Sequence, residues 1–179
     1  MALTVEWILA AEDDKALFNL LSGELERLLP KEVQRDRDLY HQTLADLPRG
    51  LRAMAGIFFL DVSIAIDDLA WHFGNQNDER YLQETLNGLH ELELFEVADL
   101  FEKAWKIMAP HLDKIRRDDW DGMNPTDWYE KIGVQQRIDP MDAIIRTHCK
   151  RAGKLGLLES WVPYARKYPG RCAVSVAVA

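Results

Sequence analysis

Apolar residues recur at steps of three and four along most of the chain, the spacing at which side chains share one face of an α-helix. Residues 13–29 are the clearest case, because six leucines follow this spacing and Pro30 marks the end. The pattern also predicts helices over residues 36–46, 51–73, 79–92, 95–109 and 140–151. Strands and helices do not alternate, so we expect a mostly α, single-domain bundle of about six to eight helices.

Residues 51–73 form the longest apolar segment and are therefore expected to be the central, most buried helix. Asp13 and Asp14 should cap the helix over 13–29, where carboxylates satisfy free N–H groups. Gly23 lies inside that helix, where glycine is unfavourable, and this predicts a close packing contact. Asp139-Pro140 has the form of a cap followed by a first-turn proline and predicts a helix start.

The chain changes character after these helices. Residues 116–128 are polar and predict a loop, in which Thr126 and Asp127 open a short helix. Prolines and glycines interrupt residues 161–170, and the last eight residues, CAVSVAVA, alternate between small and apolar types. We therefore expect a helical domain over residues 1–154 and an irregular C-terminal appendage over 155–179, loosely structured or strand-like.

The composition narrows the class of protein. The 179 residues are 47% hydrophobic, enough for one domain with a real core and too many for a disordered chain. The sequence contains neither an apolar run long enough to cross a membrane nor the features of a signal peptide. Two cysteines, Cys149 and Cys172, make no disulfide framework, so we expect a reducing, cytoplasmic setting.

The charge is distributed unevenly along the chain. The formal net charge is −8, but it divides into −3 for residues 1–60, −11 for 61–130 and +6 for 131–179. Between Asp61 and Glu102 there are eleven acids and one base, Arg80. Such segregation points to electrostatic binding rather than to catalysis.

Seven acids on the two predicted helices after residue 79 have almost no lysine between them. Solvated helices usually mix both signs, whereas DNA displays one negative charge per about 1.7 Å of its axis. We therefore interpret these acids as a surface that imitates nucleic acid and binds a basic partner, the alternative being an ordinary solvated face. The predicted partner-binding residues are Glu79, Glu84, Glu91, Glu93, Glu96, Asp99 and Glu102.

The usual catalytic motifs are missing from the sequence, which has no glycine-rich phosphate loop, no GxSxG, no CxxC and no HExxH. The best candidate for a metal or acid–base site is Asp67, Asp68 and His72, since Asp68 and His72 stand four residues apart and could share an ion. His111 and Asp113 could add ligands. A modest surface pair is the more common meaning of this spacing, since a divalent site needs three or four converging ligands. We predict no metal and no cofactor.

Four stretches within residues 50–110 form a pattern in the middle of the chain: Leu51–Leu60, Leu69–Asn75, Glu84–Leu89 and Ala98–Ala104. Together they resemble the DNA-mimic protein family, a family catalogued as a domain of unknown function. The resemblance implies an all-α fold, often dimeric, whose acidic surface occupies the DNA-binding face of a transcription factor. It implies neither an enzyme nor direct binding to nucleic acid or membrane.

Three alternatives stay open at this point. The protein could be an immunity-type inhibitor that neutralises a basic toxin, since the charge argument is the same. It could be a metal protein or enzyme that uses Asp67, Asp68 and His72. It could also be a self-associating domain, in which the acidic segment 61–102 meets the basic segment 131–179 of the same chain or of a second copy.

Overall fold

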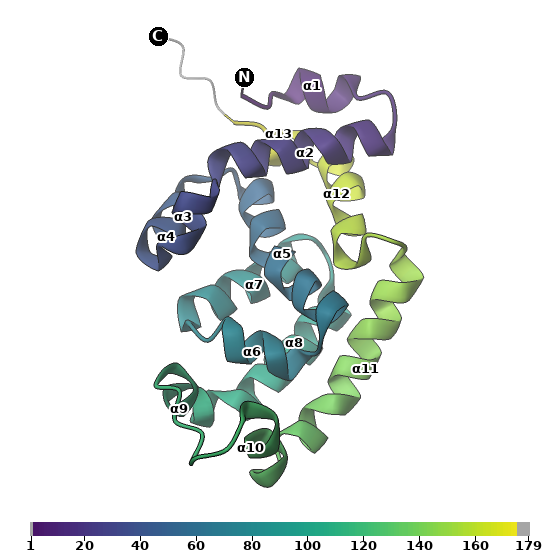
Figure 1. Ribbon diagram of the computed structural model, residues 1–179. Coiled ribbons are helices and arrows are strands. Elements are labelled where there is room, and N and C mark those ends of the chain that lie inside the picture. The colour runs from purple at the N-terminus through teal and green to yellow at the C-terminus, as the bar shows by residue number, and fades with distance from the viewer. Residues whose placement is uncertain (1, 175–179) are drawn as a thin grey trace.

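Helix α5 (Arg49–Ile66) runs through the middle of the molecule (Figure 1). Ten of its residues are buried, among them Leu51, Met54, Ile57 and Leu60, because its sequence is apolar on nearly every side. The prediction that this segment forms the central helix is confirmed. The computed structural model describes residues 2–174, and that part of the chain is helical without any strand.

Helix α7 (Glu79–Glu91) packs along α5 at unusually short range. A Cβ atom on Gly56 of α5 would lie 2.6 Å from the carbonyl oxygen of Glu84, and one on Gly88 of α7 would lie 2.6 Å from that of Ala53. The Thr85 hydroxyl donates to the Gly56 carbonyl oxygen at 2.9 Å. The two backbones touch because both helices carry glycine where they meet.

Helix α8 (Phe95–Met108) follows α7 as the second arm of a helical hairpin and also packs against α11 (Gln135–Ala152). Phe73 of α6 (Leu69–Asn75) stacks on Phe101 of α8, with 5.4 Å between ring centroids. These side chains join the buried side of the hairpin to the buried side of α6 and α5. The buried apolar residues therefore form one continuous core.

The predicted helix over 51–73 is in fact two helices, which is a correction to the sequence analysis. The backbone turns at Asp67, where φ is −141° and ψ −111°, and Asp68 begins α6 as its N-cap. The Asp68 carboxylate accepts the Trp71 N–H at 2.7 Å. An aspartate that can satisfy free N–H groups favours such a restart over an uninterrupted helix.

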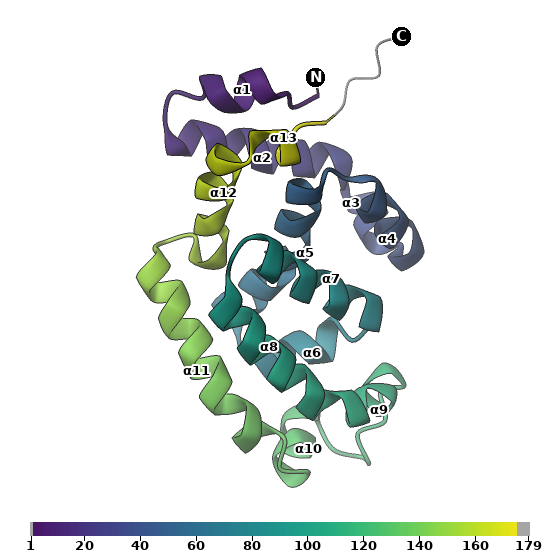
Figure 2. The same cartoon turned by 180° about the vertical axis from the view of Figure 1, so that it is seen from behind.

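The first and the last described segments of the chain lie together at one end of the molecule (Figures 1 and 2). Helices α1 (Val5–Ala10), α2 (Asp14–Leu28), α12 (Trp161–Lys167) and α13 (Pro169–Cys172) gather there. Trp161 is buried and stacks on Phe18, and the Val174 N–H donates to the Leu3 carbonyl oxygen at 2.8 Å.

Residues 156–172 therefore form helical segments packed on α2 and α5, where the sequence predicted loose or strand-like structure. Residues 175–179 of the CAVSVAVA segment lie outside the described residues. Buried aromatic and apolar side chains at Trp161 and Tyr164 supply the packing that short, proline-interrupted helices cannot obtain from propensity alone.

Six helical segments of the described chain remain, and most of them are too short to show a helical spacing of apolar residues. They are α3 (Lys31–Arg35), α4 (Arg37–Asp46), η1 (Ala109–His111), α9 (Leu112–Arg116), α10 (Pro125–Lys131) and η2 (Gly156–Ser160). Helix α4 is the helix predicted over residues 36–46. Helices α9 and α10 lie at the end of the molecule opposite to α1 and α2 (Figure 2).

Two predicted helix starts are wrong and one is right. Asp13 caps α2 as predicted, accepting the Ala16 N–H at 2.7 Å. Helix α10 is capped by Asn124 rather than opened by Thr126, and α11 begins at Gln135 with Pro140 inside it. A proline within the second turn removes one backbone hydrogen bond, which the packing of the neighbouring Ile138 in the core offsets.

The predicted close contact at Gly23 is also wrong, because a Cβ atom there would meet nothing within 4 Å.

No helix among the described residues is long and apolar enough to cross a bilayer.

Gly88 and Gly23 provide a matched pair of substitutions, one at a close helix contact and one at an open site. We expect Gly88→Ala to lower the free energy of unfolding by about 1–3 kcal/mol, since the added methyl group forces α5 and α7 apart. Gly23→Ala should raise it by about 0.5–1 kcal/mol, because the site is open and alanine favours the helix. Urea unfolding followed by circular dichroism measures both, and equal effects of the two substitutions would contradict the close contact of α5 and α7.

Candidate functional site

The seven predicted partner-binding acids lie on the α7–α8 hairpin, as their sequence positions require. Six of them fall into two groups, and Glu79 at the start of α7 stands apart. Those near the start of α5 and the C-terminal helices have intramolecular partners, and those on the outer side of α8 face solvent.

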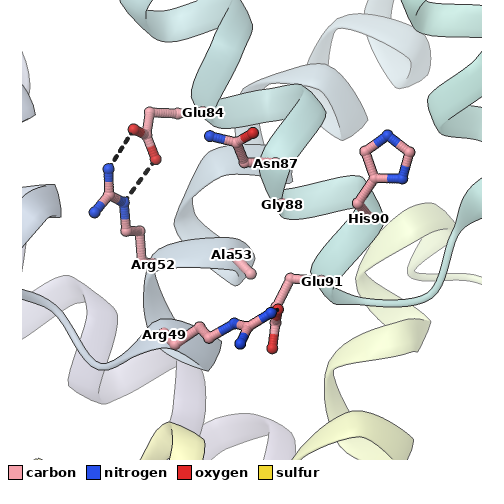
Figure 3. A pocket seen from close by; sticks show the side chains of 8 residues that line it. All are labelled: Arg49, Arg52, Ala53, Glu84, Asn87, Gly88, His90 and Glu91. Atoms are coloured by element: carbon pink, nitrogen blue, oxygen red, sulfur yellow. Dashed lines mark hydrogen bonds and ion pairs between the residues drawn. The ribbon is translucent and has the colours of Figure 1, made fainter.

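Glu84 belongs to the first group. Its carboxylate accepts two hydrogen bonds from the Arg52 guanidinium of α5, at 2.7 and 2.5 Å. This pair closes one side of a groove of about 470 Å³ between α5 and α7, shown in Figure 3. Arg49, Asn87, His90 and Glu91 complete its polar lining.

Glu91 is the most enclosed of the seven acids, with 8% of its side chain exposed. It pairs with Arg49 of α5, whose side chain extends toward it in Figure 3, and with Arg171 of α13 at 2.9 Å. The Tyr164 hydroxyl donates to the same carboxylate. Burial, and then the hydrogen bond to Glu91, raise the pKa of Tyr164. One carboxylate thus ties α7 to α5, α12 and α13.

Glu93 lies in the turn between α7 and α8 with a left-handed backbone, φ 62°. Its carboxylate accepts hydrogen bonds from Lys167 at 2.7 Å and from the Tyr168 hydroxyl at 3.0 Å. The hydrogen bond with Lys167 is the main reason why the pKa of Glu93 is lowered.

The basic C-terminal segment therefore meets part of the acidic segment within the same chain, through Arg171 and Lys167. This is the intramolecular form of the self-pairing alternative, and it holds for Glu91 and Glu93. The segregation of charge along the sequence signalled it. Tyr164 and Arg49 carried no such signal, because only the fold brings them to the hairpin.

The outer side of α8 carries a line of acids that we name the α8 carboxylate stripe: Glu96, Asp99 and Glu102. Glu96 and Asp99 are exposed and form no ion pair with any residue that the structure describes. Glu102 pairs with Lys106 at 2.9 Å, and the hydrogen bond with Lys106 lowers the pKa of its carboxyl group. Glu79 is exposed on α7 and lies 3.9 Å from Arg116.

The structure separates the two candidate metal ligands. Asp68 caps α6 near the surface, and its second oxygen accepts from Gln135 Nε2 at 3.3 Å. His72 is fully buried, and its Nδ1 lies 2.9 Å from the Ser63 hydroxyl oxygen. Within the described residues, no three His, Cys, Asp or Glu side chains are grouped so that they could hold a metal ion. His72 is thus a core residue, and its burial lowers its pKa to about 3.

Comparison with known proteins gives one match. A family model described as DMP19-like protein covers residues 45–164, from the end of α4 to α12. This confirms the family resemblance noted over residues 50–110 and extends it in both directions. The chain matches no curated protein and no solved structure.

The enclosed position of Glu91 leads to a prediction about the stability of the fold. Glu91→Gln should lower the free energy of unfolding by about 1–3 kcal/mol, because Arg49 and Arg171 lose their shared counter-charge at a poorly hydrated position. Glu102→Gln makes the same chemical change at a pair with both members open to water and should have little effect. Urea unfolding compares the two, and similar losses would show that enclosure is not the cause.

The lowered pKa of His72 leads to a prediction about how stability depends on pH. Its pKa in the folded state, about 3, lies below the ordinary value of 6.5, so the unfolded chain takes up the proton first. Stability should therefore fall as the pH decreases below about 6.5, by at most about 1.4 kcal/mol per pH unit. His72→Gln removes this contribution. Urea unfolding between about pH 7 and pH 5 should show the wild type losing more stability than the variant, and parallel losses would contradict it.

Proposed function

This chain belongs to the DMP19-like protein family, and we propose that it is a DNA-mimic-like interaction protein. In this proposal it presents carboxylates to the DNA-binding face of a basic partner protein. The observation that carries the proposal is the α8 carboxylate stripe, in which Glu96 and Asp99 have no ion pair with any described residue.

The spacing of the stripe suits this role. Its members are three residues apart, which separates them by about 4.5 Å along a helix that rises 1.5 Å per residue. Successive phosphates of one DNA strand advance by about 3.4 Å along the axis of the duplex. A helix held rigidly against α7 and α11 can therefore offer negative charges at a density similar to that of a nucleic-acid strand.

Internal pairing narrows the set of acids that a partner would use. Glu84 and Glu91 already bind arginines of α5 and are only partly accessible, so we assign them to the fold rather than to the partner. Glu93 and Glu79 are exposed at the borders of the hairpin and are weaker candidates, since each has a basic neighbour. The stripe forms the centre of the proposed surface.

The setting of the proposed function is a reducing cytoplasm, an assignment that the free thiols of Cys149 and Cys172 support. A net charge of −8 disfavours direct binding to nucleic acid, which is consistent with a protein partner. The DNA-mimic family resemblance also implies a homodimer, which is part of the proposal.

Competition with DNA tests the proposal. The full-length protein would be titrated into complexes of several purified helix-turn-helix proteins with labelled duplexes, and displacement of the duplex followed by fluorescence anisotropy. We expect displacement from at least one complex at low salt, weakened as salt rises. Reversing two charges in Glu96→Lys/Asp99→Lys should weaken the competition roughly tenfold or more.

The control reverses two exposed acids on other elements, Glu12→Lys/Glu26→Lys, which gives the same change in net charge. Competition by the control should stay near that of the wild type. Equal weakening in both variants would show that net charge alone is responsible, and failure to displace any duplex would overturn the proposal.

A further inference from the structure

A second acidic surface lies far from the C-terminal helices, where α6, the segment after α9, α10 and the start of α11 line a hollow of about 530 Å³. We name it the acidic–aromatic groove and define it by Asp67, Asp68, Trp71, Asp118, Trp120 and Tyr129. Its size is that of a small-ligand site. Glu130 and Gln135 also line it.

The charge of this groove differs from that of the groove between α5 and α7. Four carboxylates line it, from Asp67, Asp68, Asp118 and Glu130, with no lysine or arginine among the described lining residues. In the α5–α7 groove, by contrast, two arginines neutralise the two glutamates. None of these four carboxylates forms an ion pair with a described residue, whereas Lys114 pairs with Asp121 at 2.8 Å and Arg116 pairs with Asp113.

The fold holds two of these carboxylates in place. Asp68 is fixed by the Trp71 N–H and by Gln135, as described above. Asp118 has a left-handed backbone, φ 54°, and its carboxylate accepts the indole N–H of Trp120. Carboxylates oriented by their own hydrogen bonds lose little freedom when a cation binds.

Aromatic rings stand beside these acids. Trp71 is 36% exposed at the edge of the groove. Trp120 is held edge-on against Trp128 and Tyr129, with centroid separations of 5.4 and 5.9 Å. Indole faces attract cations, and most strongly those that can stack as planes.

The Tyr129 hydroxyl is the observation that separates this groove from a mere cluster of acids. Tyr129 is 5% exposed, and its oxygen has no hydrogen-bond partner among the described residues. The oxygen lies beside Gly74, another lining residue, where a Cβ atom would come within 3.2 Å of it. Burial, and then the charge of Asp68, raise the pKa of Tyr129, so this group stays a neutral phenol. An unpaired buried hydroxyl is unfavourable and is relieved by a donor from a ligand.

We propose that the acidic–aromatic groove binds the guanidinium group of an arginine on a basic protein segment. A guanidinium group is planar, carries five N–H donors and is weakly hydrated, so it can meet carboxylates, an indole face and a phenol oxygen together. An ammonium group offers a point charge that cannot stack in this way. The inference rests on the proposed function for the nature of the partner, and it adds a side-chain-specific site away from the α8 carboxylate stripe.

The test uses the full-length protein and a fluorescently labelled arginine-rich peptide. Lysine and citrulline versions of the same peptide, and spermidine, serve as competing probes. We expect the arginine peptide to bind more tightly than the lysine peptide, and the citrulline peptide and spermidine to bind poorly. Asp67→Asn/Asp118→Asn should weaken arginine binding roughly fivefold or more, since asparagine removes the charge at both positions and tolerates the left-handed backbone at position 118.

The matched control is Glu96→Gln/Asp99→Asn, which removes the same two charges from the α8 carboxylate stripe and should leave peptide binding near the wild-type value. Tyr129→Phe should weaken the arginine peptide without lowering the urea midpoint. Equal losses in the two double variants, or equal binding of lysine peptide or spermidine, would overturn the guanidinium site.

The two proposals fail separately. If the wild-type protein binds the arginine and lysine peptides equally, while Glu96→Lys/Asp99→Lys still weakens competition with DNA, the guanidinium site is removed and the proposed function stays. Specific peptide binding by a protein that displaces no duplex would remove the proposed function and leave the guanidinium site.

Discussion

The close approach of α5 and α7 is the constraint on which the rest of the structure depends. Two glycines let the backbones meet, Gly56 on one helix and Gly88 on the other, and each stands where a methyl group would strike a carbonyl oxygen. This contact decides which side of α7 is hidden. Because α8 follows α7 after a three-residue turn, it also decides which side of α8 faces water.

The same contact determines which carboxylates are paired within the chain and which stay unpaired. Once α7 lies on α5, Arg49 and Arg52 stand opposite Glu91 and Glu84, and the polar groove of Figure 3 is electrically balanced. The C-terminal helices then add Arg171 and Lys167 at the same end. Glu96 and Asp99 of α8 and the carboxylates around the start of α6 keep no ion pair with a described residue, and unpaired charge of this kind favours the binding of a cationic ligand.

Helical periodicity predicted the mostly α class, the central helix and the α7–α8 hairpin, since a buried apolar stripe is a local property of the sequence. It failed at Asp67 and Asp68, because apolar spacing continues through a break that capping makes favourable. It also failed for the segment after residue 155, where long-range packing of Trp161 stabilises helices too short to show a period.

The candidate sites were less predictable than the fold. Charge counting located the acids of α7 and α8, but pairing with residues such as Arg49 and Tyr164, far away in sequence, is a property of three-dimensional contact. The acids of the acidic–aromatic groove come from three separate segments, so no local motif marks them.

The break in the helix at Asp67 and Asp68 links stability to binding. As the N-cap of α6, Asp68 satisfies a backbone N–H that would otherwise be free, and the same hydrogen bond orients its carboxylate toward Gln135 and the groove. Asp67, one residue earlier, is exposed and ends α5 as its C-cap, where its N–H donates to the Ser63 carbonyl oxygen at 2.9 Å. A continuous helix would have dispersed these side chains around its circumference, about 100° apart, whereas the restart places both on the wall of one hollow. The feature that the periodicity missed is thus the one that assembles the acidic wall of the groove.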